Sequence, residues 1–285
     1  MTILVTAATG RLGRLVVESL LEKVPATEVA AAVRDPEKAG DLAALGVDVR
    51  QADYSRPGTL RAAFAGVDRA LLVSGTDMGA RVDQHRAVIE AAEEAGVGLL
   101  GYTSVLRADD ATFGLADDHK ATEAVLRASR VPFVLLRHGW YTENYTDQLG
   151  GYLQFGAITG SSGDGRVASA ARRDFAEAAA AVLTTDGHRN AVYELSGDTA
   201  WSFSELAAEI SAQSGTPVGY RDVPAEEHVR ILVGAGLPEP VARMLVDVDA
   251  GIGRGELAAT PGDLSRLIGR PTTPPAASIK EALAA

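Results

Sequence analysis

Residues 2–13 read TILVTAATGRLG, and this stretch decides the fold. The run Thr2–Thr6 is rich in β-branched side chains and predicts a strand. Apolar residues at helical spacing over Leu12–Leu21 predict a helix directly behind it. Glycines between the two let backbone N–H groups approach a diphosphate, and the N-terminus of the helix adds its positive dipole. The junction Ala7–Gly13 therefore predicts a dinucleotide site; the alternative is a tight turn whose glycines serve no ligand.

Short β-branched runs alternate with helical patterns through the first half of the chain, which is typical of βαβ units and a parallel sheet. The expected strands are Thr2–Thr6, Val29–Val33, Val47–Gln51, Ala70–Val73, Leu99–Tyr102 and Phe133–Arg137. The expected helices are Leu12–Leu21, Pro36–Leu45, Leu60–Phe64, Ala80–Ala95 and Ala116–Ser129. Right-handed crossovers of this length predict an α/β fold with a Rossmann-type, doubly wound parallel sheet.

The rhythm changes after about residue 140. Gly and Ser cluster at Gly156–Gly165, where no strand is predicted. Beyond it we expect helices and one strand, with Ser202 as the N-cap before Glu205: Arg173–Leu183, Val192–Leu195 (the strand), Trp201–Gln213, Ala225–Gly234 and Pro238–Val248. We interpret residues 1–140 as a cofactor-binding domain and 141–285 as a smaller, partly helical lid region, interleaved with the sheet, that completes a substrate pocket.

Composition excludes several classes of function. The 285 residues carry a formal net charge of −11 and no block rich in Lys and Arg, which argues against nucleic acid or an anionic membrane as partner. The absence of cysteine excludes disulfides, thiolate metal sites and cysteine nucleophiles. No His, Asp and Glu residues have metal-ligand spacing, so no metal is expected. No segment is long and apolar enough to span a bilayer, so a cytoplasmic location is expected. The sequence does not indicate the number of subunits.

The residue after the second strand indicates which dinucleotide is bound. NAD-specific sites place an acidic residue there for the ribose 2′-hydroxyl. This chain has Arg34, with Lys38 one helical turn later, and a guanidinium suits a 2′-phosphate. NADPH is therefore the expected cofactor. Two alternatives stay open: Arg34 pairs with Asp35 or Glu37 on the surface, or Asp35 itself faces the ribose and NADH is used.

A missing motif limits the chemistry. Short-chain dehydrogenases that reduce ketones use Tyr-x-x-x-Lys on the helix after the fifth strand, where the lysine lowers the tyrosine pKa. None of the seven tyrosines here has a lysine four residues on, and the matching helix carries His119, Lys120 and Glu123 instead. This favours an acceptor such as a quinone, whose reduced anion is delocalised. His119 either donates a proton or orients the substrate, or it is bonded to a carboxylate such as Asp118 or Glu123.

These motifs together resemble the NmrA-like atypical short-chain dehydrogenases, and within them the bacterial type 2 NAD(P)H:quinone oxidoreductases. Triphenylmethane dye reductases are similar over much of the same length. The resemblance covers nearly the whole chain. The matching stretches are Thr6–Gly13, Val33–Pro36, Asp53-Tyr54, Gln84-His85, Tyr102–Ser104, Leu115–His119, Leu136–Tyr145, Tyr193–Asp198 and Leu267–Gly269.

The resemblance implies a flavin-free enzyme that carries NADPH in an extended cleft. It places Arg34 at the 2′-phosphate, Asp53 near the adenine, and Ser74 and Gly75 near the ribose of the nicotinamide half. The residues that it assigns to the pyrophosphate are Ala7, Ala8, Thr9, Gly10, Arg11 and Leu12, with Gly13 packing the helix. The loop that it expects to close on the nicotinamide and the substrate contains His138, Gly139, Trp140, Tyr141, Thr142, Glu143 and Asn144.

Aromatic residues after the sixth strand suit a flat acceptor. Trp140, Tyr141 and Tyr145 are expected to wall it, or else to pack in the core under the lid. Asn144 binds the nicotinamide amide or the substrate, or it caps the following helix. The catalytic candidates are His119, Tyr141 and Asn144, and none is singled out. Gln84-His85, on the helix after the fourth strand, faces the cofactor or lies in solvent.

One position departs from the family. Ala7 stands where the family has its first glycine; alanine is strained there if φ is positive and tolerable if φ is negative. Two other functions compete with quinone reduction. One is reduction of another conjugated acceptor, such as a cationic dye, and the other is a non-catalytic NADP sensor that binds a regulatory partner.

Overall fold

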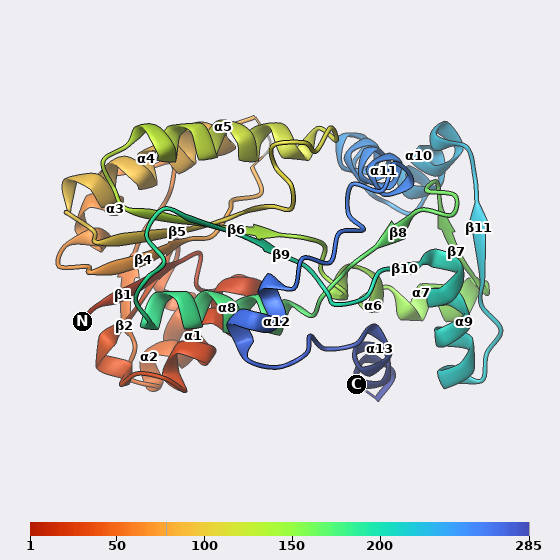
Figure 1. Cartoon of the computed structure of the whole chain (residues 1–285), viewed down its shortest axis with the longest axis horizontal. Helices are drawn as coiled ribbons and strands as arrows, with labels where there is room; N and C mark the ends of the chain where they lie inside the picture. Colours follow the sequence, from red (N-terminus) through yellow and green to blue (C-terminus); the bar gives the residue numbers. More distant parts are fainter. Residues whose placement is uncertain (78, 285) are drawn as a thin grey trace.

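The computed structural model describes residues 1–77 and 79–284 and has a seven-stranded parallel sheet at its centre (Figure 1). The strand order is β3-β2-β1-β4-β5-β6-β9, and every neighbouring pair is parallel. The strands are β1 (Ile3–Thr6), β2 (Val29–Val33), β3 (Asp48–Gln51), β4 (Arg69–Leu72), β5 (Leu99–Val105), β6 (Phe133–His138) and β9 (Ala191–Leu195). The predicted Rossmann-type doubly wound sheet is confirmed.

Helices cover both faces of this sheet. Helices α1 (Arg11–Leu21) and α8 (Arg172–Thr184) pack on one face, and α3 (Pro57–Phe64), α4 (Arg81–Glu94) and α5 (Leu115–Ala128) pack on the other. Because both faces are covered, successive residues of β1 are all buried, which explains its unbroken apolar run. Within the described residues, no helix is both long enough and apolar enough to cross a membrane.

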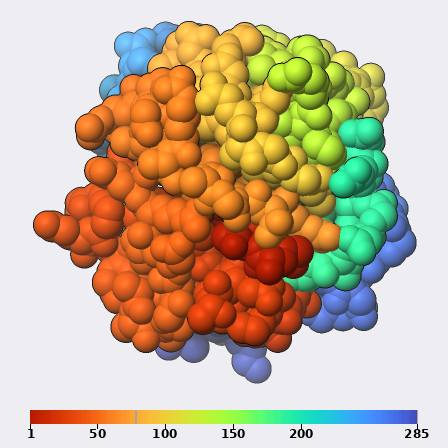
Figure 2. Space-filling view, turned by 90° about the vertical axis from the view of Figure 1, so that its left-hand side faces the viewer, coloured from red at the N-terminus to blue at the C-terminus, as the bar shows by residue number. Residues whose placement is uncertain are grey.

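The order of the strands sets where a ligand can bind. The chain winds outward from β1 in both directions, so β1 and β4 flank the point at which the order reverses. The turns after these two strands, 7–10 and 73–77, therefore diverge at the carboxyl edge of the sheet, where ligands of such folds bind. Figure 2 views the opposite, amino edge, where the N-terminus (dark red) lies beside the segment 185–189 (teal).

The remaining elements form a smaller region, on the right in Figure 1. Its core joins aromatic side chains, among them Tyr145, Trp201 and Phe203. Its elements are α6 (Glu143–Thr146), α7 (Leu149–Phe155), β7 (Ala157–Gly160), β8 (Arg166–Val167), β10 (Trp201–Ser202), α9 (Phe203–Ser214), β11 (Gly219–Asp222), α10 (Ala225–Gly234), α11 (Glu239–Gly253) and α13 (Pro275–Ala284). The predicted capping box of Ser202 and Glu205 starts α9.

Several segments differ from the pattern expected, among them Trp201, which lies in β10 and not in a helix. The single helix predicted over Pro36–Leu45 is a 3-10 turn, η2 (Pro36–Ala39), followed by the short α2 (Gly40–Ala44), because the Asp35 side chain accepts the Glu37 N–H and begins a tight turn. The stretch Gly156–Gly165, for which no strand was expected, contains β7 and reaches the turn before β8. Strand β7 pairs with β11 about sixty residues on, a non-local partner that local pattern does not reveal.

Residues beyond 140 also build the main sheet. Strand β9 adds its seventh strand beside β6, and α8 is the crossover helix that leads to it. Helix α12 (Asp263–Ile268) packs against α8 and β9. The N-terminus of α8 lies near the N-terminus of α1, since both helices run from the carboxyl edge toward the amino edge. A segment far along the chain thus reaches the phosphate loop.

The turn after β1 has a strained backbone. Ala7 has φ 48°, so the family's glycine is replaced at a left-handed position and the strained alternative is the one observed. The Gly10 N–H donates to the Ala7 carbonyl oxygen at 2.8 Å. A Cβ at Gly13 would lie 2.4 Å from the same oxygen, so only glycine lets α1 begin this close to β1.

Replacing Ala7 by glycine is expected to raise the free energy of unfolding by up to about 1 kcal/mol, because the left-handed conformation costs alanine about that much more than glycine. Urea denaturation measures the change. Ala8→Gly is the matched control: Ala8 is buried and has no positive φ, so glycine there should lower the free energy of unfolding. Equal destabilisation by both substitutions would contradict the strain at Ala7.

Candidate active site

The N-terminus of α1 presents free backbone donors at the carboxyl edge. Gly10 is its N-cap, no side chain caps it, and its first turn holds no acidic residue. Among the described residues, the N–H groups of Arg11, Leu12 and Gly13 have no acceptor. Three unpaired donors and the positive end of a helix dipole together form a site for an anion such as a phosphate.

The end of β2 adds a free cation to this edge. Arg34 is exposed, and its guanidinium forms no ion pair within residues 1–77 and 79–284, so the expected alternative of pairing with Asp35 or Glu37 is not observed. The Asp35 carboxylate accepts the Glu37 N–H at 3.2 Å and lies 3.8 Å from the Lys38 Nζ. Arg34 is therefore available to a phosphate, while Asp35 is already engaged by its own turn.

A surface turn follows β3. The Asp53 carboxylate accepts the Ser55 N–H at 2.9 Å, which orders the turn at the place where the adenine was expected. Gln84 on α4 donates to the Ser55 hydroxyl oxygen at 3.2 Å and to the Asp77 carboxylate at 2.9 Å. These contacts hold the turn after β3 to the start of α4.

The turn after β4 is clamped by buried side chains of α4. The Gly75 N–H donates to His85 Nε2 at 2.9 Å, and Arg81 Nε donates to the Gly75 carbonyl oxygen at 2.8 Å. The Ser74 N–H donates to Thr103 Oγ1 at 2.8 Å. The sequence suggested that His85 faces the cofactor or lies in solvent, but the structure buries it completely against the Gly75 turn. Burial and the nearby Arg81 charge lower the pKa of His85 to about 3.

His138 ends β6 with one ring nitrogen unpaired. Its ring stacks on Phe175 of α8 with centroids 4.5 Å apart, and its Nδ1 lies 3.1 Å from the Tyr141 hydroxyl. Its Nε2 is sealed from solvent and has no partner among the described residues. Burial lowers the pKa of His138 to about 3, so the ring is neutral at working pH.

Arg172 is a site residue that the sequence analysis missed. It is 9% exposed, its guanidinium lies 4.9 Å from the centre of the Tyr141 ring, and no carboxylate of the described chain pairs with it. Its backbone N–H is capped by the Glu143 carboxylate at 2.8 Å. The guanidinium nitrogens have no protein partner in the described residues and are not sealed from solvent, so they are available to an anionic ligand. Nothing in the sequence separates it from its neighbour Arg173, which pairs with Glu281.

The other residues of the loop after β6 divide between two apolar clusters. Tyr141 packs with α1 and α8, whereas Trp140 packs with the smaller region; both are half-buried. Tyr145 is buried in the same cluster as Trp140, edge-on to Trp201 at 5.0 Å. Thr142 is also buried, with its hydroxyl bonded to that of Ser169. The three expected aromatics therefore do not form one continuous wall.

Asn144 lies inside α6 and does not cap it, because the N-cap of α6 is Thr142. Its side-chain amide forms no hydrogen bond within the described part of the chain, so it is free to bind a ligand. Arg11, in the first turn of α1, pairs with Asp147, which directly follows α6. This ion pair joins the phosphate loop to the smaller region.

Helix α5 carries the residues that stand where other dehydrogenases have their acid pair. His119 is 7% exposed, and its Nδ1 lies 2.8 Å from the Tyr102 hydroxyl, so the expected bond to Asp118 or Glu123 is not formed. Lys120 donates to the Ala111 carbonyl oxygen at 2.6 Å. Its ammonium is therefore bound to the loop before α5.

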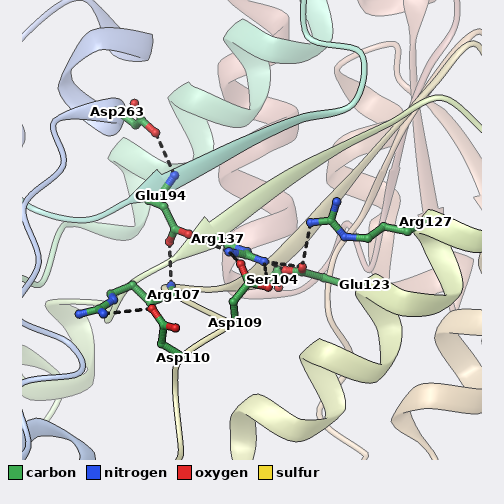
Figure 3. Close-up of polar contacts among 9 residues, drawn as sticks. All are labelled: Ser104, Arg107, Asp109, Asp110, Glu123, Arg127, Arg137, Glu194 and Asp263. Carbon is green, nitrogen blue, oxygen red and sulfur yellow. Dashed lines mark hydrogen bonds and ion pairs between the residues drawn. The ribbon is translucent and has the colours of Figure 1, made fainter.

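Beneath the loops after β5 and β6 lies a buried ionic cluster centred on Arg137 (Figure 3). Arg137 is 3% exposed and donates to the carboxylates of Glu123, Asp109 and Glu194 at 2.7–3.0 Å. Burial opposes its charge, but the three carboxylates outweigh it and raise the pKa of Arg137 above its usual range. Glu123 also accepts the Ser104 hydroxyl at 2.6 Å.

The cluster ties the carboxyl ends of three strands to the loop that leads into α5. In register, Arg137 of β6 stands between Ser104 of β5 and Glu194 of β9. Glu194 also accepts the N–H of Arg107, a residue with φ 51° at the start of the loop. We infer that the cluster supports the loops after β5 and β6.

Comparison with known proteins places this geometry among nucleotide-dependent reductases. A family described as NAD(P)H-binding matches residues 7–186. Quinone oxidoreductase 2 of Escherichia coli (strain K12) is 47% identical over 277 residues, 97% of each chain. The crystal structure of the NADPH-dependent quinone oxidoreductase QOR2 of Escherichia coli with NADPH superposes with a TM-score of 0.96 at 46% identity, covering 99% of this chain and 100% of that one. Triphenylmethane reductase of Citrobacter sp. with NADP(H) gives 0.95 at 41% identity, covering 99% and 100%.

Arg172 and Arg137 should respond differently to substitution. Arg172→Gln is expected to change the free energy of unfolding of the ligand-free protein little, because its guanidinium forms no ion pair in the described residues and its nitrogens reach solvent. Arg137→Gln is the matched control and is expected to lower it by about 3–5 kcal/mol, because buried carboxylates would lose their counter-charge. Urea denaturation without ligand measures both. A large loss of stability on Arg172→Gln would mean that its guanidinium serves the fold and no ligand.

Proposed function

We propose that this chain, which belongs to the NmrA-like family of NAD(P)H-binding proteins, is an oxidoreductase that reduces quinones with NADPH. The observation that carries the proposal is a set of unpaired donors and cations at the carboxyl edge: the N-terminus of α1, Arg34 and Arg172. Near full-length similarity to an NADPH-dependent quinone oxidoreductase supports the same conclusion.

The residues fit NADPH, whose anionic groups match these donors. The free N–H groups of Arg11, Leu12 and Gly13 would take the pyrophosphate, with Ala7, Ala8, Thr9 and Gly10 forming the turn around it. Arg34 would bind the 2′-phosphate, with Lys38 adding charge. When bound, the cofactor supplies hydride to the acceptor. The buried Arg172 would bind a further anionic or carbonyl group beside the nicotinamide loop.

The remaining predicted contacts follow the cofactor from adenine to nicotinamide. Asp53 would lie near the adenine, and the clamped turn of Ser74 and Gly75 would lie under the ribose of the nicotinamide half. The loop from His138 through Gly139 to Glu143 would close over the nicotinamide. In this arrangement residues 1–140 bind the cofactor and 141–285 complete the substrate site, while β9 and α8 return to the sheet.

The acceptor is assigned from the acid groups that the chain has and lacks. Helix α5 has no Tyr-x-x-x-Lys pair, and Lys120 is bound to the Ala111 carbonyl. A simple ketone would develop a localised alkoxide that needs a proton at once, whereas a quinone spreads the charge over an aromatising ring. Trp140, Tyr141 and Asn144 would border the flat acceptor, with Tyr145 behind them in the core. A cationic dye is the second candidate, since triphenylmethane reductase shares the fold at 41% identity.

Arg34→Ala should weaken NADPH binding by about 1.5–3 kcal/mol, because it removes a charge-assisted contact to the 2′-phosphate. NADH, which has no such phosphate, should be almost unaffected. Isothermal titration calorimetry with both cofactors measures the difference. Arg61→Ala, which removes another exposed arginine that pairs with Glu94, is the control and should change neither affinity. Equal losses for both cofactors would mean that Arg34 does not bind the phosphate.

The wild-type protein should oxidise NADPH rapidly with benzoquinones or naphthoquinones and slowly with simple ketones and aldehydes. The reason is the missing acid pair, and a panel of acceptors followed by NADPH absorbance tests it. A triarylmethane dye belongs in the panel as the competing acceptor. Turnover of ketones with none of any quinone would overturn the assignment, and tight NADPH binding without turnover of any acceptor would instead indicate a sensor.

A further inference from the structure

Quinone reduction leaves negative charge on an oxygen of the acceptor. The inference below rests on the proposed function and concerns which side chain faces that oxygen. Donors aimed at the place where charge develops are a large source of rate enhancement. At the carboxyl ends of β4 and β5, buried His85 bonds the clamped Ser74–Gly75 turn, its ring packs on that of Tyr102, and the Tyr102 ring packs on that of His119.

The Tyr102 hydroxyl lies beside one nitrogen of the His119 ring. Tyr102 is fully buried on β5, and a buried phenol needs an acceptor for its single proton. His119 Nδ1 lies 2.8 Å from the phenol oxygen, and the hydroxyls of Ser74 and Thr122 are further hydrogen-bond partners. An imidazole nitrogen is a stronger acceptor than a hydroxyl oxygen, which favours donation of the phenol proton to Nδ1. A neutral His119 then carries its own proton on Nε2.

The neighbouring hydroxyl does not reverse this assignment. Thr122 Oγ1 donates to the Asp118 carbonyl oxygen at 2.8 Å and lies 3.0 Å from His85 Nδ1. Because His85 Nε2 accepts the Gly75 N–H, its proton is on Nδ1 and is donated to Thr122. The Thr122 proton is thus already used, so Thr122 does not donate to the Tyr102 hydroxyl, and its oxygen is a weaker acceptor for the phenol proton than His119 Nδ1.

His119 Nε2 has no hydrogen-bond partner in the described part of the chain and is not completely sealed from solvent. Among the side-chain nitrogen and oxygen atoms of the described residues, His138 Nε2 is the only one that is both sealed from solvent and without a hydrogen-bond partner. His119 Nε2 forms no hydrogen bond either, so it is not sealed. His119 lies in the second turn of α5, next to Asp118, which pairs at 3.1 Å with the Arg81 that holds the Gly75 carbonyl.

We propose that the Nε2–H of His119 is a preset hydrogen-bond donor to the acceptor oxygen on which negative charge develops, and that Tyr102 is the positioning residue that holds His119 in this tautomer. A neutral imidazole can polarise an oxygen in this way without being charged.

The surroundings of His119 keep its ring neutral. Burial is the main cause, and the charge of Arg81 and the rings of His85 and His138 add to it, lowering the pKa of His119 to about 3. Arg81 and His85 come from α4, Tyr102 from β5 and His138 from β6, while the carboxylates of Asp118 and Glu123 on α5 itself are paired with Arg81 and Arg137. The donor is therefore present throughout the neutral pH range.

The chemistry balances without a proton from His119. The quinone accepts hydride at one carbonyl oxygen, where an O–H bond forms, and NADPH becomes NADP⁺. The two electrons reduce the ring, and the other C=O becomes the C–O⁻ of the hydroquinone monoanion. His119 donates a hydrogen bond to that oxygen and keeps its proton. Water then supplies the single proton that completes the hydroquinone, so Tyr102 never has to form a buried phenolate.

Imidazole ¹⁵N NMR of the ligand-free protein tests the tautomer without any turnover. The chain has five histidines, and the signal lost in His119→Gln identifies His119. The expected result is an Nε2–H tautomer in the wild type and a mixture of tautomers in Tyr102→Phe. Tyr193→Phe is the matched control, because the Tyr193 hydroxyl lies 2.7 Å from His188 Nδ1 at the other edge of the sheet and should alter only His188. An Nδ1–H tautomer of His119 in the wild type would overturn the proposal.

Kinetics with a series of quinones tests the donor itself. His119→Leu should lower kcat/KM for quinones by about 10- to 100-fold, and His119→Gln, which keeps an N–H near the same place, by less. The ratio of wild type to His119→Leu should rise with the basicity of the hydroquinone anion, since a more basic oxygen gains more from a donor. The Kd for NADPH should stay unchanged.

Two outcomes separate this inference from the proposed function. If the wild type reduces no quinone, the proposed function fails, and the NMR result still decides whether Tyr102 sets the tautomer. If the wild type reduces quinones but His119→Leu loses nothing, or loses the same factor on every quinone together with NADPH affinity, His119 supports the structure and does not touch the acceptor.

Discussion

The close approach of α1 to the turn after β1 is the contact on which the site depends. A Cβ at Gly13 would lie 2.4 Å from the Ala7 carbonyl oxygen, so the helix can begin here only with glycine at this position. The same turn holds Ala7 at φ 48° and directs its carbonyl to the Gly10 N–H. The outcome is a helix N-terminus with three unpaired N–H groups at the point where the strand order reverses. The strained backbone of Ala7 therefore accompanies a turn whose N–H groups are free to bind an anion.

The buried charges of this protein fall into two kinds. Arg137 is surrounded by three carboxylates and joins the ends of β5, β6 and β9 to the loop before α5. Arg172 is 9% exposed, faces an aromatic ring and pairs with no carboxylate in the described residues, but its guanidinium nitrogens reach solvent. The first arginine is therefore explained by the fold, whereas the second is left available for the ligand that we propose. Together with Arg34, it would give a strongly acidic chain a local site for a polyanion.

A buried polar network joins the turn after β4 to α4 and α5. Gly75 is held by His85 and Arg81, and these are held in turn by Thr122 and Asp118 of α5. His119 belongs to the same helix, so the donor that we propose and the Ser74–Gly75 turn are positioned by a common set of contacts.

The sequence alone predicted the strands and most of the flanking helices of the main sheet, and a nucleotide-binding turn after the first strand. Period-two and helical patterns located every strand of the sheet within about three residues, and the phosphate loop and Arg34 could be placed because strand ends in such a sheet converge at one edge. Strand β7, the role of His85 and the partner of His119 could not be placed, since each depends on residues distant in the chain. Arg172 and Arg173 are adjacent on α8, and the sequence pattern does not indicate which of the two faces the protein. The packing of α8 against the sheet decides this. Local sequence decides backbone conformation and which face is apolar; only the tertiary structure decides which polar groups are left without a partner, and those are the groups that bind.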